Sequence, residues 1–227
     1  MNDQKSAAAK LKGLYAITDP ALLPDDKLLS GVESALSGGA SIIQYRDKTA
    51  SEAQRLRDAE NLRSITQQFG ALLLINDDIE LCCRVEADGV HLGKNDGDIG
   101  AARARLGANK VLGVTCHRDI DYARHVIDLG VDYCAFGRLF SSRTKPEAPH
   151  CPVELLSEAA RLSCPTLAIG GITTDNFAAL LNRGIDMIAV IHGLFGQDDI
   201  EATARSLSRP CLRSDNTHSK STRVLNT

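Results

Sequence analysis

Eight short runs of apolar residues alternate with longer amphipathic stretches between residues 13 and 208. The runs are rich in Ile, Val and Leu, which is typical of strands that are buried on both faces of a parallel sheet. They span residues 13–18, 41–47, 71–76, 89–93, 111–116, 133–140, 166–170 and 187–193. We predict a strand in each of them.

The stretches between these runs have the spacing of amphipathic helices. In residues 25–37, Leu28, Val32 and Leu36 fall on one face, and residues 51–69 show the same spacing. The other predicted helices span residues 79–85, 99–106, 119–129, 152–162, 175–182 and 198–207. Several predicted helices end at a glycine suited to the left-handed C-terminal cap, namely Gly70, Gly107, Gly130 and Gly184.

Eight strand–helix pairs in succession predict an α/β fold, the closed (β/α)8 TIM barrel. The alternative of similar length is an open, doubly wound sheet. A dinucleotide-binding sheet of that kind should carry a G-x-G-x-x-G loop after its first strand, whereas here the first run leads into Asp19 and Pro20. We therefore expect one barrel domain over residues 12–208, a flexible N-terminus over residues 1–11 and a disordered tail over residues 209–227.

Composition limits the classes of partner and the compartment. A net charge of -3 gives no reason to expect nucleic acid or an anionic membrane as a partner, and no window approaches the roughly 18–20 apolar residues of a membrane span. The seven cysteines are irregularly spaced, lie mostly in apolar runs and form no C-x-x-C pair, so we interpret them as reduced thiols. With no signal-peptide core at the N-terminus, we expect a cytoplasmic protein. Homo-oligomer formation stays open.

Polar, chemically capable residues gather where the predicted strands end, which is where barrel enzymes build their sites. After the second strand, Gln44, Arg46 and Lys48 occupy alternate positions and should all face the barrel mouth. Two cations on one inward face are costly to bury unless an anionic group meets them. We expect a bound anion there, and the alternative is ion pairing with Asp47 or Asp77.

Asp77 and Asp96 follow neighbouring strands and are candidate ligands for Mg²⁺, which proteins hold with one or two carboxylates plus substrate phosphates. Helix capping is the alternative for aspartates here, and it explains Asp78 and Asp98 better than Asp96.

Two further segments have the composition of phosphate sites. Residues 141–145 offer three hydroxyls and two cations after a long strand, although an ordinary solvated loop has the same composition. Gly170 and Gly171 follow the seventh strand, a common place for phosphate in barrels. His91 lies within a strand and is expected to have a structural role, whereas His117 and His192 at strand ends are candidates for substrate contact.

The strand-end motifs resemble the thiamine-phosphate synthase family. They are GLYAITD, GGASIIQYRDK, LLINDD, ADGVHLGKND, LGVTCH, FGRLFSSRTKPEAP, AIGGIT and AVIHGLFG, in family order over about residues 12–196. The resemblance implies a (β/α)8 barrel that joins hydroxymethylpyrimidine diphosphate to hydroxyethylthiazole phosphate, giving thiamine phosphate and pyrophosphate. Its implied partners are therefore phosphorylated small molecules, and its implied cofactor is Mg²⁺.

The resemblance also implies roles for individual residues. The implied pyrimidine diphosphate set is Gln44, Tyr45, Arg46, Asp47, Lys48, Asn76, Thr115 and Lys145, of which Arg46, Lys48, Thr115 and Lys145 are implied to be catalytic. The implied thiazole phosphate set is Ser142, Arg143, Thr144, Gly171, Ile191 and His192, and the implied magnesium ligands are Asp77 and Asp96. Thr115 and His192 stand where many family members have serine.

Two other functions fit parts of this pattern. A relative that only isomerises the thiazole ring needs no set of diphosphate and magnesium ligands, so the presence of Arg46, Lys48, Asp77, Asp96 and Lys145 together argues against it. A non-catalytic protein that sequesters a phosphorylated thiamine precursor would bind ligand without turnover.

Overall fold

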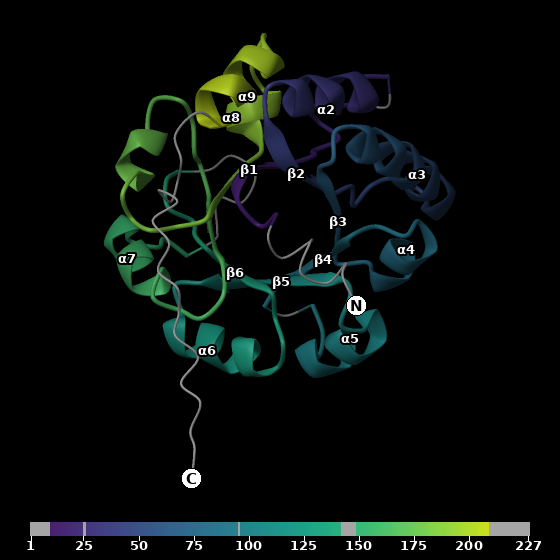
Figure 1. Cartoon of the computed structure of the whole chain (residues 1–227). Helices are drawn as coiled ribbons and strands as arrows, with labels where there is room; N and C mark the ends of the chain where they lie inside the picture. Colours follow the sequence, from purple (N-terminus) through teal and green to yellow (C-terminus); the bar gives the residue numbers. More distant parts are fainter. Residues whose placement is uncertain (1–9, 25, 95, 142–148, 209–227) are drawn as a thin grey trace.

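The computed structural model describes residues 10–24, 26–94, 96–141 and 149–208, and in it eight parallel strands close into a barrel in sequence order. Helices surround the ring of strands on the outside (Figure 1). The strands are β1 (Gly13–Ile17), β2 (Ala40–Tyr45), β3 (Leu72–Asn76), β4 (Gly89–Leu92), β5 (Val111–His117), β6 (Tyr133–Phe136), β7 (Thr166–Ile169) and β8 (Met187–Val190). The ring closes where β8 pairs with β1, and the prediction of a (β/α)8 barrel is confirmed.

The helices follow the predicted pattern for most of the chain. The α-helices are α2 (Leu28–Ser37), α3 (Glu52–Gln68), α4 (Ile79–Arg84), α5 (Ile99–Leu106), α6 (Ile120–Asp128), α7 (Leu156–Ala159), α8 (His192–Phe195) and α9 (Ile200–Ser208). Two 3-10 turns, η1 (Val153–Leu155) and η2 (Phe177–Leu180), complete the set. Asp78 and Asp98 cap α4 and α5 as expected, and all four predicted glycine caps have positive φ.

The structure corrects four of the predicted elements. The strand predicted over residues 187–193 ends at Val190, and the helix α8 begins at His192. Strand β6 ends at Phe136 rather than at residue 140, because the backbone of Arg138 is hydrogen-bonded to Pro149 and Cys151 instead of to a neighbouring strand. The helix predicted over residues 175–182 is the short turn η2, because the Asn176 side chain bonds the backbone of Thr173 and Gly171 and keeps the preceding residues in a loop. The helix predicted over residues 152–162 is divided between η1 and α7.

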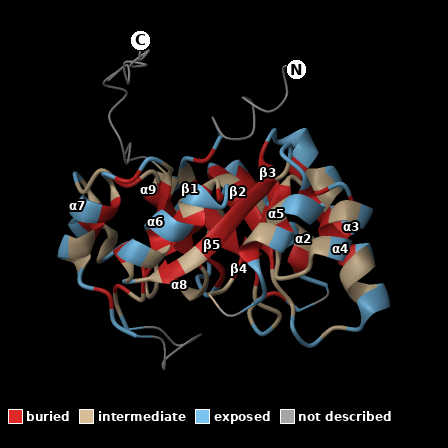
Figure 2. Ribbon diagram, turned by 90° about the horizontal axis from the view of Figure 1, so that it is seen from below, coloured by how far each residue is buried: buried red, intermediate tan, exposed pale blue. Residues whose placement is uncertain are grey.

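Two apolar layers hold the barrel together. The larger layer lies between the strands and the helices and is built from Leu, Ile, Val and Ala. The smaller layer fills the barrel interior, with Tyr15, Ile42, Leu74, Tyr133 and Met187 among its members. Figure 2 shows the strands as a buried centre, with exposed residues on the outer faces of the helices. The six cysteines within the described residues are free thiols, and no helix in this part of the chain is long and apolar enough to cross a membrane.

Candidate active site

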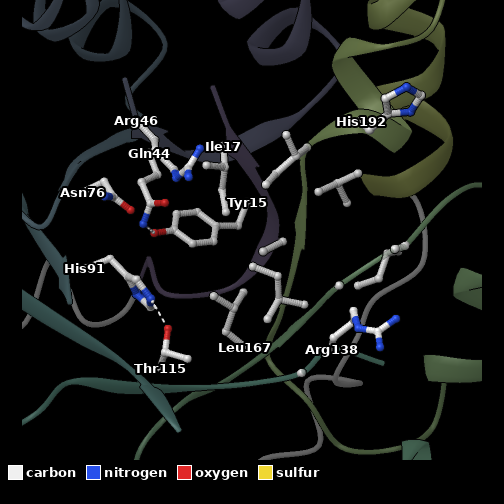
Figure 3. Close-up of a pocket in the computed structure, with 18 of the residues that line it drawn as sticks. Tyr15, Ile17, Gln44, Arg46, Asn76, His91, Thr115, Arg138, Leu167 and His192 are labelled. Atoms are coloured by element: carbon white, nitrogen blue, oxygen red, sulfur yellow. Dashed lines mark hydrogen bonds between the residues drawn. The ribbon is translucent and has the colours of Figure 1, made fainter. Parts of the chain in front are cut away.

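A cavity of about 430 Å³ opens at the carboxyl ends of the strands, within the usual size range of small-molecule sites. Its lining combines charged groups with an apolar wall that includes Ile17, Leu167 and Ile169 (Figure 3). Most of the residues predicted for the two substrates and the metal lie around this mouth. The predicted residues that line it are Gln44, Arg46, Lys48, Asn76, Asp77, Asp96, Thr115, Gly171, Ile191 and His192.

The alternation of β2 decides which residues of the predicted diphosphate segment reach the cavity. Gln44, Arg46 and Lys48 line it, as their spacing predicts. The side chain of Tyr45 points the other way, is buried between β2 and the helices, and donates a hydrogen bond to Asp58 at 2.9 Å. Asp47 accepts hydrogen bonds from the backbone of Thr49 and Ala50 and shapes the loop. The side chains of Tyr45 and Asp47 therefore do not line the mouth, which corrects their predicted placement.

The backbone of Arg46 is hydrogen-bonded to Thr18, and its side chain lines the cavity. Its backbone N–H donates to the hydroxyl of Thr18 at 2.8 Å. Its buried Nε has no hydrogen-bond partner among the described residues. A buried guanidinium donor of this kind is costly unless a ligand completes it, so its position favours an anionic ligand.

Lys48, the second cation of this segment, forms the ion pair with Asp77 that was the alternative to a bound anion. The ammonium group of Lys48 lies 3.0 Å from the Asp77 carboxylate and stays more than half exposed. Because an exposed pair of this kind contributes little to stability, the Lys48 ammonium can shift to an incoming phosphate at small cost.

Asp77 and Asp96 supply two carboxylates to the same part of the mouth. Burial alone would raise the pKa of Asp77, but the hydrogen bond and the charge of Lys48, together with a hydrogen bond from the Asn76 amide, hold that pKa below its ordinary value. Asp96 also accepts the backbone N–H of Gly93 at 2.8 Å, and a side chain at position 93 would collide with its carboxylate. Asp77 adopts a left-handed backbone with φ of 62°, a conformation that clusters at functional sites.

These donors fit a magnesium ion that is shared with a substrate. Within the described residues there is no cluster of three or more His, Cys, Asp or Glu side chains, so a site made of protein ligands alone is not indicated. Two hard carboxylates in an open, cationic mouth are the set that Mg²⁺ uses when substrate oxygens complete its coordination.

A buried chain of hydrogen bonds crosses the floor of the cavity. The Gln44 amide donates to the Tyr15 hydroxyl at 2.9 Å, and the hydroxyls of Tyr15 and Tyr133 are 2.9 Å apart. His91 Nδ1 lies 2.8 Å from the Tyr133 hydroxyl, and its Nε2 lies 2.9 Å from the hydroxyl of Thr115. Both ring nitrogens of His91 are thus hydrogen-bonded inside the barrel, as expected for a structural histidine.

The opposite side of the mouth is built from glycines and backbone. Gly170 and Gly171 have φ of 108° and 68°, and side chains at these positions would collide with Arg138 and with the carbonyl of Ser141. Gly193, at the start of α8, packs equally closely on the carbonyl of Ile172. The glycines that follow the seventh predicted strand are therefore needed for close backbone contacts at the cavity. Ile191 and His192 line the same cavity.

Four of the predicted site residues, Ser142, Arg143, Thr144 and Lys145, lie outside the described residues. Ser141, which immediately precedes them, lines the cavity.

Sequence reasoning missed Arg138 and Tyr15, which both line the cavity. Arg138 follows the true end of β6, and its signal was a cation inside a run that we predicted to be strand throughout. Tyr15 and Ile17 both lie on the inner face of β1. The sequence feature that could have identified Tyr15 is a polar hydroxyl within an apolar strand.

Comparison with known proteins agrees with this geometry. A family model described as thiamine monophosphate synthase matches residues 14–194. The chain belongs to the thiamine monophosphate synthase family. Members of this family are enzymes of thiamine biosynthesis, so the chain is a transferase that acts on phosphorylated small molecules.

Individual members of the family cover nearly all of the barrel. The chain is 52% identical to a thiamine-phosphate synthase of Alcanivorax borkumensis over 203 residues, which is 88% of this chain and 94% of the relative. It is 49% identical to the thiamine-phosphate synthase of Marinobacter nauticus, covering 88% and 91% of the two chains. A solved structure, the thiamine phosphate pyrophosphorylase from Pyrococcus furiosus, superposes with a TM-score of 0.80 at 33% identity and covers 88% of this chain and 95% of its own.

Proposed function

We propose that this enzyme condenses hydroxymethylpyrimidine diphosphate with hydroxyethylthiazole phosphate, releasing thiamine phosphate and pyrophosphate. The observation that carries the proposal is the mouth of the barrel, where the Arg46 side chain lines a cavity that also holds Lys48 and two carboxylates. Such a mouth suits a diphosphate with a divalent ion, and membership of the family supplies the identity of the two substrates.

The pyrimidine diphosphate is assigned to the half of the cavity formed by β2 to β5. Arg46 and Lys48 would bind the diphosphate, with Asn76 beside them at the end of β3. Gln44 and Thr115 would contact the pyrimidine ring on the cavity floor. Lys145, which the family resemblance adds to this set, is the residue we propose to complete the cationic group.

Asp77 and Asp96 would hold Mg²⁺ at the same place. When bound, the ion supplies positive charge that neutralises the diphosphate oxygens.

The thiazole phosphate is assigned to the opposite half of the cavity. Gly171, Ile191 and His192 line it, and the close backbone approaches at Gly170 and Gly171 leave room for a phosphate against main-chain groups. Ser142, Arg143 and Thr144 are proposed to complete this set.

In the proposed reaction the bond between the pyrimidine methylene carbon and the diphosphate oxygen breaks, and the electron pair leaves with pyrophosphate. The thiazole nitrogen then forms the new bond to that carbon. Arg46 and Lys48 stabilise the charge that grows on the leaving group, which is electrostatic catalysis by preorganised donors. The apolar wall of Ile17, Leu167 and Ile169 excludes water from the methylene carbon. Anchoring both substrates by their phosphates keeps the two reacting atoms in line.

The deciding experiment incubates the purified protein with both substrates, with and without Mg²⁺, and measures thiamine phosphate and pyrophosphate. We expect equal amounts of the two products, with strong dependence on the ion. Isomerisation of the thiazole phosphate without pyrophosphate release would identify the ring-isomerising relative. Tight binding with no product would identify a sequestering protein.

We further propose that the enzyme works in the cytoplasm. The free thiols of the described residues support this, because they suit a reducing compartment. Light scattering of the 24.4 kDa chain tests whether it forms a homo-oligomer.

A further inference from the structure

Five side chains from five different strands form one continuous hydrogen-bonded chain under the proposed pyrimidine site. It runs from Gln44 on β2 through Tyr15, Tyr133 and His91 to Thr115 on β5, with successive separations of 2.9, 2.9, 2.8 and 2.9 Å. Figure 3 shows Tyr15 and His91 between the two end residues, Gln44 and Thr115, which both line the cavity. The three middle residues are buried, with Tyr15 and His91 also reaching the cavity floor, and the chain connects Gln44 to Thr115.

The number of hydrogens links the donor and acceptor roles along this chain. Burial raises the pKa of Tyr15 and Tyr133, so each phenol keeps its single hydrogen. Tyr15 accepts from the Gln44 amide and can therefore give its hydrogen to Tyr133. In that arrangement Tyr133 gives its hydrogen to Nδ1 of His91, which leaves the His91 Nε2–H to donate to Thr115. Both ring nitrogens face hydroxyl oxygens, and in this arrangement Nδ1 accepts while Nε2–H donates.

Every donor and acceptor along the chain would be exchanged if the oxygen and nitrogen of the Gln44 amide changed places. The groups around that amide therefore decide which orientation is favoured. Arg46 lies two residues beyond Gln44, just past the end of β2, and brings a positive charge to the cavity lining. A nearby cation attracts an amide oxygen and repels an amide NH₂ group, which favours the Gln44 oxygen on the cavity side. The Gln44 oxygen accepts no hydrogen bond from the residues that the structure describes, and it is available to a ligand.

We propose that Tyr15, Tyr133 and His91 are positioning residues that fix the hydrogen-bonding sense of the pyrimidine site, making Gln44 an acceptor and the Thr115 hydroxyl a donor toward the ligand. Tyr133 can occupy the centre of this chain because position 113 on β5 is glycine, and a side chain there would overlap the Tyr133 ring. The proposal rests on the proposed function for the identity of the ligand. The direction of the chain is a property of the protein alone.

A fixed acceptor and a fixed donor select among planar nitrogen heterocycles. An aminopyrimidine offers an exocyclic N–H₂ donor and ring nitrogen acceptors, which complement the two end groups. The 4-oxo analogue replaces the amino donor with a carbonyl acceptor, which would meet the Gln44 oxygen and leave both acceptors unsatisfied. Rejection of such a ligand is strong in buried sites because an unpaired polar group keeps its full desolvation cost.

The direction of the chain is tested first without any substrate. Nitrogen NMR of the ring-labelled wild-type protein distinguishes the two neutral tautomers and the protonated ring of each of the six histidines. The His91→Gln variant identifies the His91 signals by their loss. We expect an unprotonated Nδ1 and a protonated Nε2. The Nδ1–H tautomer or a doubly protonated ring would overturn the proposal.

The consequence for the ligand is tested with Tyr133→Phe. We expect kcat/KM for the pyrimidine diphosphate to fall about tenfold, while KM for the thiazole phosphate stays within about twofold. Preference for the amino substrate over its 4-oxo analogue should fall by about tenfold as well, because His91 loses the bond that sets its tautomer. Tyr15→Phe cuts the chain one bond earlier and should change the same two quantities in the same direction.

The matched control is Tyr122→Phe, which removes a phenol from α6 outside the cavity lining and should leave both quantities unchanged. Equal loss for both substrates, or unchanged amino preference in both the Tyr133 and Tyr15 variants, would contradict the positioning role. If Tyr133→Phe fails to fold, Tyr15→Phe and the wild-type tautomer still decide the question. Failure of the wild type to release pyrophosphate would instead remove the proposed function, and the tautomer would still report the direction of the chain.

Discussion

The two halves of the barrel mouth are built on different principles. The charged half consists of Arg46, Lys48, Asp77 and Asp96 and presents ionised side chains. The glycine half consists of Gly170, Gly171 and Gly193 together with Ile191, and it brings main chain close to the cavity by omitting side chains. Both halves are proposed to bind phosphate groups, yet one does so with charge and the other with shape and backbone amides.

The difference teaches where each half should be sensitive to mutation. In the charged half, individual charged groups stabilise the bound diphosphate and the leaving group, so their removal should lower the rate. In the glycine half, binding depends on the backbone conformation. A methyl group added at a glycine should therefore weaken phosphate binding more than the exchange of one side chain for another.

The largest effect is expected for Arg46→Ala. We predict that kcat/KM for the pyrimidine diphosphate falls about 1000-fold, or about 4 kcal/mol, because the leaving group loses a preorganised donor. Steady-state pyrophosphate release measures this, and circular dichroism checks that the barrel is retained. Arg46→Lys keeps the charge without the planar fork and should recover part of the loss. A loss of less than tenfold would remove Arg46 from the charged half.

A smaller effect is expected for Asp96→Asn. Its magnesium requirement should rise about 10- to 100-fold, and excess magnesium should restore part of the activity. Titration of activity against the ion gives the shift. Asp98→Asn is the matched control, because Asp98 caps α5 outside the cavity lining and asparagine caps equally well. An unchanged magnesium curve for Asp96→Asn would mean that Asp96 is not a ligand.

Gly171→Ala tests the glycine half. The left-handed φ of 68° and the close carbonyl of Ser141 leave no room for a methyl group, so we predict that KM for the thiazole phosphate rises about tenfold and the free energy of unfolding falls by about 1–2 kcal/mol. KM for the pyrimidine diphosphate should stay constant. Gly184→Ala has similar backbone strain away from the cavity, at φ of 74°, and should lose stability without a change in either KM. Equal KM changes in the two variants would show a general loss of structure.

The smallest effect is expected for His192→Ser. If the backbone makes the phosphate contact, KM for the thiazole phosphate should change by no more than about threefold. Steady-state assays with varied thiazole phosphate measure this value. A rise of tenfold or more would show that the imidazole itself contacts the phosphate, and the distinction between the two halves would weaken.

The charged half could be predicted from the sequence because strand alternation is a local rule. Gln44, Arg46 and Lys48 were placed in the mouth by their spacing alone, and the structure puts them there. Tyr45 was assigned with them through a motif that resembles the family, although the same alternation turns its side chain toward Asp58. The error arose because a motif is continuous in sequence, whereas a strand divides it between two faces.

The hydrogen-bonded chain could not be predicted in the same way. Its members come from β1, β2, β4, β5 and β6, and their contacts exist because the ring closes around Tyr133. No short-range pattern records which inward side chains meet across a barrel. The length of η2 was missed for a related reason, because the side-chain bond from Asn176 to Gly171 replaces a helical turn with loop.

The pairing of β8 with β1 joins the latest strand to the earliest one. During synthesis, residues 13–16 emerge long before their partners at residues 187–190, which follow only when nearly the whole barrel has left the ribosome. A nascent chain therefore carries bare strand edges for most of its translation, and such edges readily pair with other copies. Slow translation or a shortage of chaperones should accordingly harm unfinished chains first, while completed molecules are protected by the closed ring.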